Sequence, residues 1–123
     1  MILLDTNALL WFHAGHRRSL PLARVAGRLY ASPASLLEVE LLVESGRLRL
    51  RSSGSAAELL QDDRWLIYDP PAIAWFERAL EHGWSRDPFD RLLVAHAQLR
   101  GWRLATADRA ILARMGGTGS LAL

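Results

Sequence analysis

The chain has 123 residues, half of them hydrophobic, and its formal net charge at pH 7 is only +2. This length suits a single domain, residues 1–123, that can bury a core of its own. There is no cysteine, which excludes a disulfide framework and a thiolate metal site. The N-terminus lacks the basic and apolar runs of a signal peptide or membrane span, so we expect a cytoplasmic protein without a membrane partner.

The first quarter of the chain predicts a strand that passes directly into a helix. Residues Ile2–Leu4 are apolar, and Asp5 follows them just before the helix-forming run Ala8–His13. An aspartate at that junction either caps the helix or faces a ligand at the carboxyl edge of a sheet. After a loop at 15–19, we expect a short helix over 20–27 and a second strand over 29–32.

A longer helix is predicted over 33–45, where Ser32-Pro33 supplies the start signals and Gly46 the stop. Three glutamates, Glu38, Glu40 and Glu44, lie among its leucines and valines. Each is compatible with a solvated outer face, and the helical period by itself leaves open which glutamate points inward.

The second half continues the alternation of helices and strands. We expect an edge strand or extended loop over 47–51, a polar linker over 52–55, and helices over 56–61, 72–82, 88–100 and 109–114. Strands are expected over 65–68 and 102–106, and residues 120–123 add an edge strand or fray. The alternation predicts a three-layer α/β/α sandwich on a mainly parallel sheet.

Two carboxylates three positions apart open the helix over 88–100. Asp87 before Pro88 is a good N-cap, and the helix dipole favours an acid at Asp90. Asp108 is also a possible cap. Capping does not explain why Asp5 and Asp108 both follow apolar strands, which places them on the same edge of a parallel sheet. Asp90 begins the helix that leads to the second of those strands.

Such a cluster of acids is typical of a divalent metal site. Neighbouring carboxylates repel one another unless a cation lies between them, and oxygen ligands suit Mg²⁺ or Mn²⁺. The four histidines are scattered, so a zinc set is not indicated. Carboxylate-bound metals often hydrolyse phosphodiesters, and no glycine-rich loop for a nucleoside triphosphate is present.

Five segments of the chain resemble one known family. They are Leu3–Trp11, Ser32–Glu38, Gly46–Leu48, Asp87–Ala97 and Thr106–Asp108, and they span nearly the whole chain. The pattern is similar to that of PIN-domain ribonucleases, specifically the VapC-type toxins of toxin–antitoxin pairs. The resemblance implies a single PIN-like nuclease domain that cleaves RNA with Mg²⁺ or Mn²⁺, forms a homodimer and is inhibited by an antitoxin protein.

The resemblance also implies roles for individual residues. The catalytic metal site is expected to consist of Asp5, Glu38, Asp90 and Asp108, with Glu38 chosen over Glu40 because it follows the Ser-Leu-Leu segment. Asp87 is expected to be an accessory acid, and Thr6, Asn7 and Thr106 match polar positions that line or brace the site. For the RNA backbone, the candidate contacts are Arg17, Arg18, Arg86, Arg91 and Arg109.

The chain departs from the family pattern at two places. Leu42 stands where close relatives often carry a lysine or arginine, and the tail after Met115 lacks the usual final strand pattern. A phosphoaspartate protein is disfavoured because the chain contains no lysine. The remaining alternative is a catalytically inactive PIN-like module that binds RNA or a partner protein.

Overall fold

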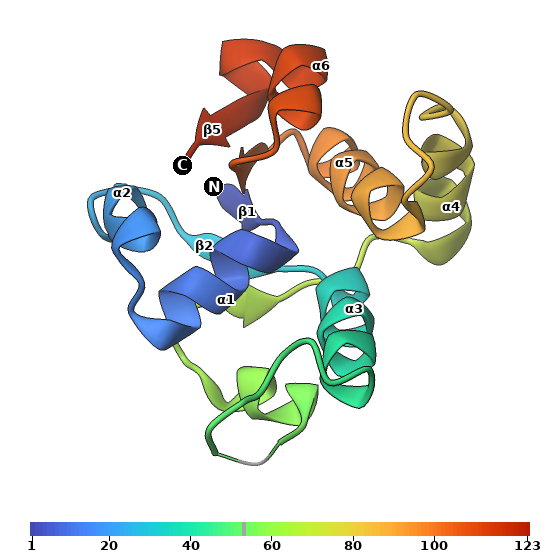
Figure 1. Ribbon diagram of the computed structural model, residues 1–123. Coiled ribbons are helices and arrows are strands. Elements are labelled where there is room, and N and C mark those ends of the chain that lie inside the picture. Colours follow the sequence, from blue (N-terminus) through green and yellow to red (C-terminus); the bar gives the residue numbers. More distant parts are fainter. Residues whose placement is uncertain (53) are drawn as a thin grey trace.

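The computed structural model describes residues 1–52 and 54–123, and its strands form one parallel sheet (Figure 1). The strand order is β3-β2-β1-β4-β5, and every neighbouring pair is parallel. The strands are β1 (Ile2–Leu4), β2 (Leu29–Ala31), β3 (Leu66–Ile67), β4 (Arg103–Thr106) and β5 (Ser120–Ala122). The predicted parallel sheet is confirmed, and β1 occupies its centre.

The helices cover both faces of this sheet, as Figure 1 shows, so the predicted three-layer α/β/α sandwich is confirmed. The α-helices are α1 (Thr6–Ala14), α2 (Leu20–Ala23), α3 (Pro33–Glu44), α4 (Ala72–Leu80), α5 (Pro88–Arg100) and α6 (Arg109–Gly119). Two 3-10 helices are η1 (Arg17–Ser19) and η2 (Ala56–Gln61). Among the described residues, no helix combines the length and apolar character needed to cross a bilayer.

Strand β1 holds the two helical layers together because its alternate side chains face opposite sides of the sheet. Ile2 and Leu4 belong to a buried cluster with Ala8 and Leu9 of α1. Leu3 packs in another cluster, whose members include residues of α5, β4 and α6. A strand buried on both faces is continuously apolar, which explains the Ile-Leu-Leu run that the polar Asp5 ends.

Several boundaries differ from those expected. Helix α2 ends at Ala23 rather than Gly27, and η1 occupies the end of the expected loop. Residues 47–51 form no strand, which leaves the extended-loop alternative. The polar linker expected over 52–55 includes Ser53, which lies outside the described residues.

The C-terminal segment is more ordered than its glycines suggested. Helix α6 continues beyond Arg114, the expected end, and is kinked at Gly116, where φ is 70°. Only glycine adopts this backbone conformation readily, so Gly116 turns the chain. Strand β5 then pairs with β4, and the Ser120 hydroxyl donates to the Gly116 carbonyl at 2.7 Å. The edge-strand alternative for the tail is therefore confirmed over Ser120–Ala122.

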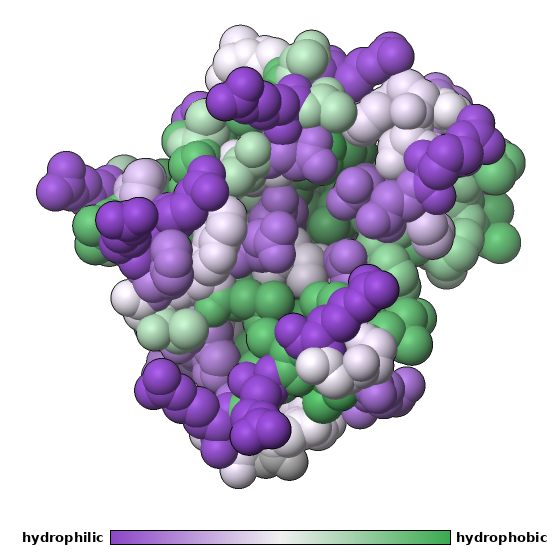
Figure 2. Space-filling view, in the orientation of Figure 1, coloured by the Kyte–Doolittle hydropathy of each residue, from purple (hydrophilic) through white to green (hydrophobic). Residues whose placement is uncertain are grey.

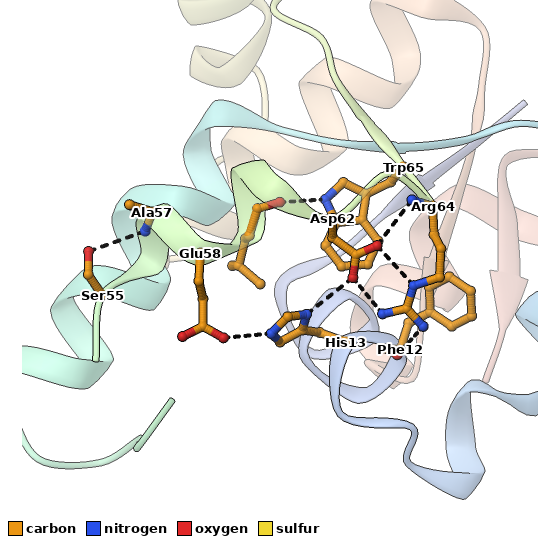
Figure 3. Close-up of polar contacts among 9 residues, drawn as sticks. Phe12, His13, Ser55, Ala57, Glu58, Asp62, Arg64 and Trp65 are labelled. Carbon is orange, nitrogen blue, oxygen red and sulfur yellow. Dashed lines mark hydrogen bonds and ion pairs between the residues drawn. The ribbon is translucent and has the colours of Figure 1, made fainter. Parts of the chain in front are cut away.

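A polar network ties η2 to the far end of α1 (Figure 3). His13 Nε2 lies 2.7 Å from Glu58 Oε2, and His13 Nδ1 lies 3.2 Å from Asp62 Oδ2. Arg64 Nε donates to Asp62 Oδ1 at 2.9 Å, and hydrogen bonds from Arg64 hold the pKa of Asp62 well below its usual range. This network fixes α1 against the segment that follows α3.

Candidate active site

Asp5 and Asp108 lie at the carboxyl ends of the adjacent strands β1 and β4. Each caps the helix that follows: Ala8 N donates to Asp5 Oδ1 at 2.7 Å, and Ala110 N donates to Asp108 Oδ1 at 2.9 Å. Asp5 is only 7% exposed, whereas Asp108 is exposed. Capping and a place at the sheet edge are thus compatible in both residues, since a second carboxylate oxygen remains on each.

Thr106, buried at the end of β4, connects these two acids. Its side chain hydrogen-bonds to Asp5, and its Oγ1 accepts a hydrogen bond from Asp108 N at 3.0 Å. A hydroxyl group can donate and accept at once, so one side chain fixes both partners. Thr106 therefore lies between two of the acids expected at the site and contacts both.

The two acids at the start of α5 have different surroundings. Asp87 Oδ1 accepts hydrogen bonds from Phe89 N at 2.8 Å and Asp90 N at 3.2 Å, which is the predicted N-cap. The Asp90 carboxylate makes no hydrogen bond to any described residue, and Asp90 lines the same hollow as the other acids, whose charges act on it. Asp87 therefore caps the start of α5, and the Asp90 carboxylate takes no part in capping.

Helix α3 presents Glu38 to the same place. Ser32 caps the helix by accepting from Ala34 N at 3.2 Å, and the Thr6 hydroxyl donates to Glu38 Oε1. Glu40 points elsewhere and accepts from Ala56 N at 2.8 Å. Of the three glutamates that helical periodicity left open, Glu38 thus lies near Asp5 and Asp90, whereas Glu40 anchors η2.

These side chains line a hollow of about 290 Å³ at the sheet edge. Figure 2 shows it as a hydrophilic depression near the centre of this face. Its lining includes all four acids expected to be catalytic, together with Thr6, Asn7, Trp11, Arg18 and Leu42. A second hollow of about 710 Å³ adjoins it, since Glu38 and Leu42 line both. The two hollows form one groove, with Asp87 and Phe89 in its second half.

The clustered carboxylates perturb one another. Burial raises the pKa of Asp90 to about 7, and the negative charges of Asp87, Asp108, Glu38 and Asp5 add to the shift. Burial also raises the pKa of Glu38 and of Asp5, although hydrogen bonds from Thr6 and Thr106, respectively, oppose it. At neutral pH the cluster thus carries more negative charge than its surroundings stabilise, a condition that a cation relieves.

The acids are near one another but are not arranged as a finished metal site. Within the described residues, no group of three His, Cys, Asp or Glu side chains has the geometry to hold an ion as it stands. Mutual repulsion keeps carboxylates apart, and the Thr6 hydroxyl holds Glu38 by one oxygen. The donor set nevertheless suits Mg²⁺ or Mn²⁺, because it consists of carboxylate and hydroxyl oxygens without thiol or imidazole.

The arginines expected to contact RNA divide into three groups. Arg18 lines the first hollow and Arg86 the second. Arg91 Nε donates to the Ser85 carbonyl at 2.7 Å and so holds the loop before α5. Arg17 and Arg109 are exposed and line neither hollow.

The lining includes residues that the sequence analysis did not assign to the site, among them Arg47 and Trp11. Arg47 lines the second hollow, and the available signal for it was its place in the family-like segment Gly46–Leu48, directly after the glycine that follows α3. Trp11 lines the first hollow, although an aromatic residue within an apolar helix is usually assigned to the core.

Comparison with known proteins identifies the family of this chain. A sequence profile of the PIN domain matches residues 2–117. The ribonuclease VapC22 of Mycobacterium tuberculosis is 31% identical over 113 residues, which cover 88% of this chain and 87% of that protein. The chain therefore belongs to the PIN-domain family and resembles its VapC-type members.

Solved structures show the same fold over the full length. A toxin–antitoxin complex from Klebsiella pneumoniae matches with a TM-score of 0.71 at 20% identity, covering 99% of this chain and 97% of that chain. VapBC2 from Rickettsia felis, bound to a DNA fragment from its promoter, matches with a TM-score of 0.70 at 19% identity, covering 100% and 99%. At such identities, the likeness supports the fold alone.

Proposed function

We propose that this protein is a divalent-metal-dependent endoribonuclease that acts as the toxin of a toxin–antitoxin pair. The observation that carries the proposal is the placement of Asp5, Glu38, Asp90 and Asp108 around one hollow, where the pKa of Asp90 is raised to about 7. Strongly perturbed carboxyls in a cleft are candidates for catalysis. The VapC22 ribonuclease relative supports RNA as the substrate.

Mg²⁺ or Mn²⁺ is the proposed cofactor, held by Asp90, Asp5, Asp108 and Glu38. When bound, the ion supplies Lewis-acid catalysis of phosphodiester hydrolysis. The chain's own residues prepare this site: Thr6 orients the Glu38 carboxylate, and Thr106 orients Asp5. Asp87 adds negative charge beside Asp90 and fixes the start of α5.

The groove on either side of the acids is the proposed path of the RNA. Arg18 lies at one end, and Arg47 and Arg86 line the other. Positive side chains at both ends bind the phosphates that flank the cleaved bond, while the acids occupy the middle. Cellular RNA as substrate implies action in the cytoplasm, with residues 1–123 as one nuclease domain.

An antitoxin protein and a second copy of the chain are the proposed partners. Structural neighbours that are toxin–antitoxin complexes support the first. The second is supported by an apolar surface on α4, where Ile73, Phe76 and Leu80 are 75%, 56% and 77% exposed. An apolar patch pairs readily with its own copy across a two-fold axis.

The proposal is tested by incubating purified protein with total RNA and Mg²⁺ or Mn²⁺. We expect cleavage by the wild type and a loss of more than about a hundredfold in Asp5→Asn and Asp90→Asn, since even outer partners of metal ligands cost 10–100-fold. Asp63→Asn, which changes an exposed acid away from the groove, should cleave normally. Undiminished cleavage by Asp90→Asn would refute the site, and RNA binding without any cleavage would favour the catalytically inactive module.

A further inference from the structure

Trp11 has an unusual place for a tryptophan in an apolar helix. Its neighbours in α1, Leu10 and Phe12, pack against a buried cluster, but Trp11 belongs to none of the hydrophobic clusters of the described residues. Its half-buried side chain instead lines the hollow that holds Asp5 and Asp90. A large aromatic ring is therefore available in the groove rather than used for folding.

A cation already lies on this ring. The guanidinium carbon of Arg18 is 4.7 Å from the centroid of the Trp11 ring, and the His16 ring stacks against the indole at 5.8 Å with an interplanar angle of 25°. Arg18 is exposed, and one of its terminal nitrogens donates to the Leu123 carbonyl at 3.1 Å. The positively charged guanidinium of Arg18 thus lies over the Trp11 ring and is itself exposed to solvent.

The rest of the hollow indicates which group of a ligand replaces Arg18 on the Trp11 ring. A nucleotide whose phosphate lies near the carboxylates must rest its base on the remaining wall, and Trp11 and Leu42 supply the large apolar side chains there. Indole rings are effective platforms for bases in single-stranded nucleic acids. In a duplex, the bases are stacked on one another, so their faces are not available to Trp11.

We propose that Trp11 forms a stacking subsite for one nucleobase of single-stranded RNA beside the cleaved phosphate. This inference rests on the proposed nuclease function and adds to it a binding subsite for a base. Arg18 gives up its place on the ring to the base and turns its guanidinium to the adjoining phosphate. The exchange is favourable because an exposed cation–π contact contributes on the order of two- to fivefold in affinity, whereas base stacking contributes about five- to a hundredfold.

The same chain contains a matched pair of residues elsewhere. The Arg114 guanidinium carbon lies 5.4 Å from the centroid of the Trp84 ring, but neither residue lines either hollow of the groove. Trp84 packs against a core cluster and donates through Nε1 to His82. Trp84→Leu therefore removes a tryptophan–arginine pair without touching the proposed subsite.

The test measures RNA binding apart from cleavage. All variants carry Asp90→Asn so that the RNA stays intact, and fluorescence anisotropy gives the Kd for labelled octauridylate and for an octamer of the same backbone without bases. The parent is compared with Trp11→Leu, Trp11→Phe, Arg18→Gln and Trp84→Leu, each checked for its melting temperature.

The parent should bind octauridylate at least about fivefold more tightly than the octamer without bases. Trp11→Leu should reduce this ratio to near one, while Trp11→Phe and Trp84→Leu keep it. Arg18→Gln should keep a preference for octauridylate, because the Trp11 ring on which the base stacks is still present. A parent that shows no preference, a Trp11→Leu variant that keeps it, or an equal loss in Trp84→Leu overturns the subsite. Cleavage by the wild type, measured separately, decides the nuclease proposal, so the two are distinguished.

Discussion

The hydroxyl of Thr6 donates a hydrogen bond to Glu38 and lies 3.0 Å from the Ser35 hydroxyl, so it joins the first turn of α1 to α3. Thr6 and Ser35 are both buried, at 6% and 0% exposure. A single hydroxyl thus fixes the distance between the sheet edge that carries Asp5 and the helix that carries Glu38. Substitution of Thr6 tests how far the site depends on the contact between its hydroxyl and Glu38.

Thr6→Val should impair both stability and activity. Valine has the shape of threonine, but it leaves the buried Ser35 hydroxyl and the Glu38 carboxylate without their partner, which costs about 1–3 kcal/mol. We expect the free energy of unfolding in urea to fall by that amount and the cleavage rate to fall by about tenfold. Thr6→Ser, which keeps the hydroxyl, should retain most of both; equal losses in the two variants would show that the hydroxyl is not the cause.

Asp90 should make the metal-free protein less stable as the pH rises. Its pKa is about 7 in the folded chain, above the ordinary value of 3.8, so the folded state holds the proton more tightly than the unfolded state. The contribution of Asp90 to the free energy of unfolding is then most favourable below about pH 4, and it declines between pH 4 and 7.

Asp90→Asn removes this penalty. At pH 8 in EDTA we expect the variant to unfold at a higher temperature than the wild type, with a free energy of unfolding larger by about 1–2 kcal/mol once solvent screening of a partly exposed carboxyl is allowed for. At pH 4 the two proteins should differ little. Added Mg²⁺ should stabilise the wild type more than the variant; a wild type whose stability is flat from pH 4 to 8 would contradict the argument.

His96 should make the protein sensitive to acid. Its ring is fully buried, neither nitrogen has a hydrogen-bond partner among the described residues, and it lies between Trp75 and Trp102. Burial lowers the pKa of His96 to about 4, below the ordinary 6.5, so the folded state resists its protonation. Its unfavourable effect is absent above pH 6.5 and grows as the pH falls toward 4.

His96→Leu should therefore stabilise the protein. The gain is expected to be about 1 kcal/mol at pH 7.5, where unpaired buried nitrogens are removed, and larger at pH 5, where the penalty for charging is removed as well. Urea titrations at the two pH values measure the difference. A gain that does not grow between pH 7.5 and pH 5 would show that protonation of His96 is not linked to unfolding.

The exposed face of α4 should determine the oligomeric state. Ile73 and Leu80 are 75% and 77% exposed, which is costly for large aliphatic side chains unless another surface covers them. Ile73→Glu with Leu80→Glu should convert a dimer to a monomer in size-exclusion chromatography with light scattering. Leu60→Glu, on η2 and 54% exposed, serves as the control; a monomeric wild type would refute the dimer.

Local signals predicted most of the elements. Asp87-Pro88 and Ser32-Pro33 begin α5 and α3, and Gly15 and Gly101 end α1 and α5 with positive φ angles of 71° and 68°. These signals work because helix ends need partners for their free N–H and C=O groups within a few residues. The predicted ends of α2 and α6 were wrong. No such signal stands where α2 ends, and the end of α6 depends on the pairing of β5 with β4.

The sequence by itself determined the residue types and their order: acids after two apolar strands, acids at the start of one helix, and a glutamate in another. The helical period did not determine which glutamate enters the site, and only the resemblance of the Ser-Leu-Leu-Glu segment to the PIN family indicated Glu38. The tertiary structure shows the contacts that separate Glu38 from Glu40, with Thr6 on one side and η2 on the other. The places of Trp11 and Arg47 in the groove were likewise decided by the tertiary structure. The groove is formed by segments that are distant in the chain, and the packing of α1, α3 and α5 around the sheet edge brings them together.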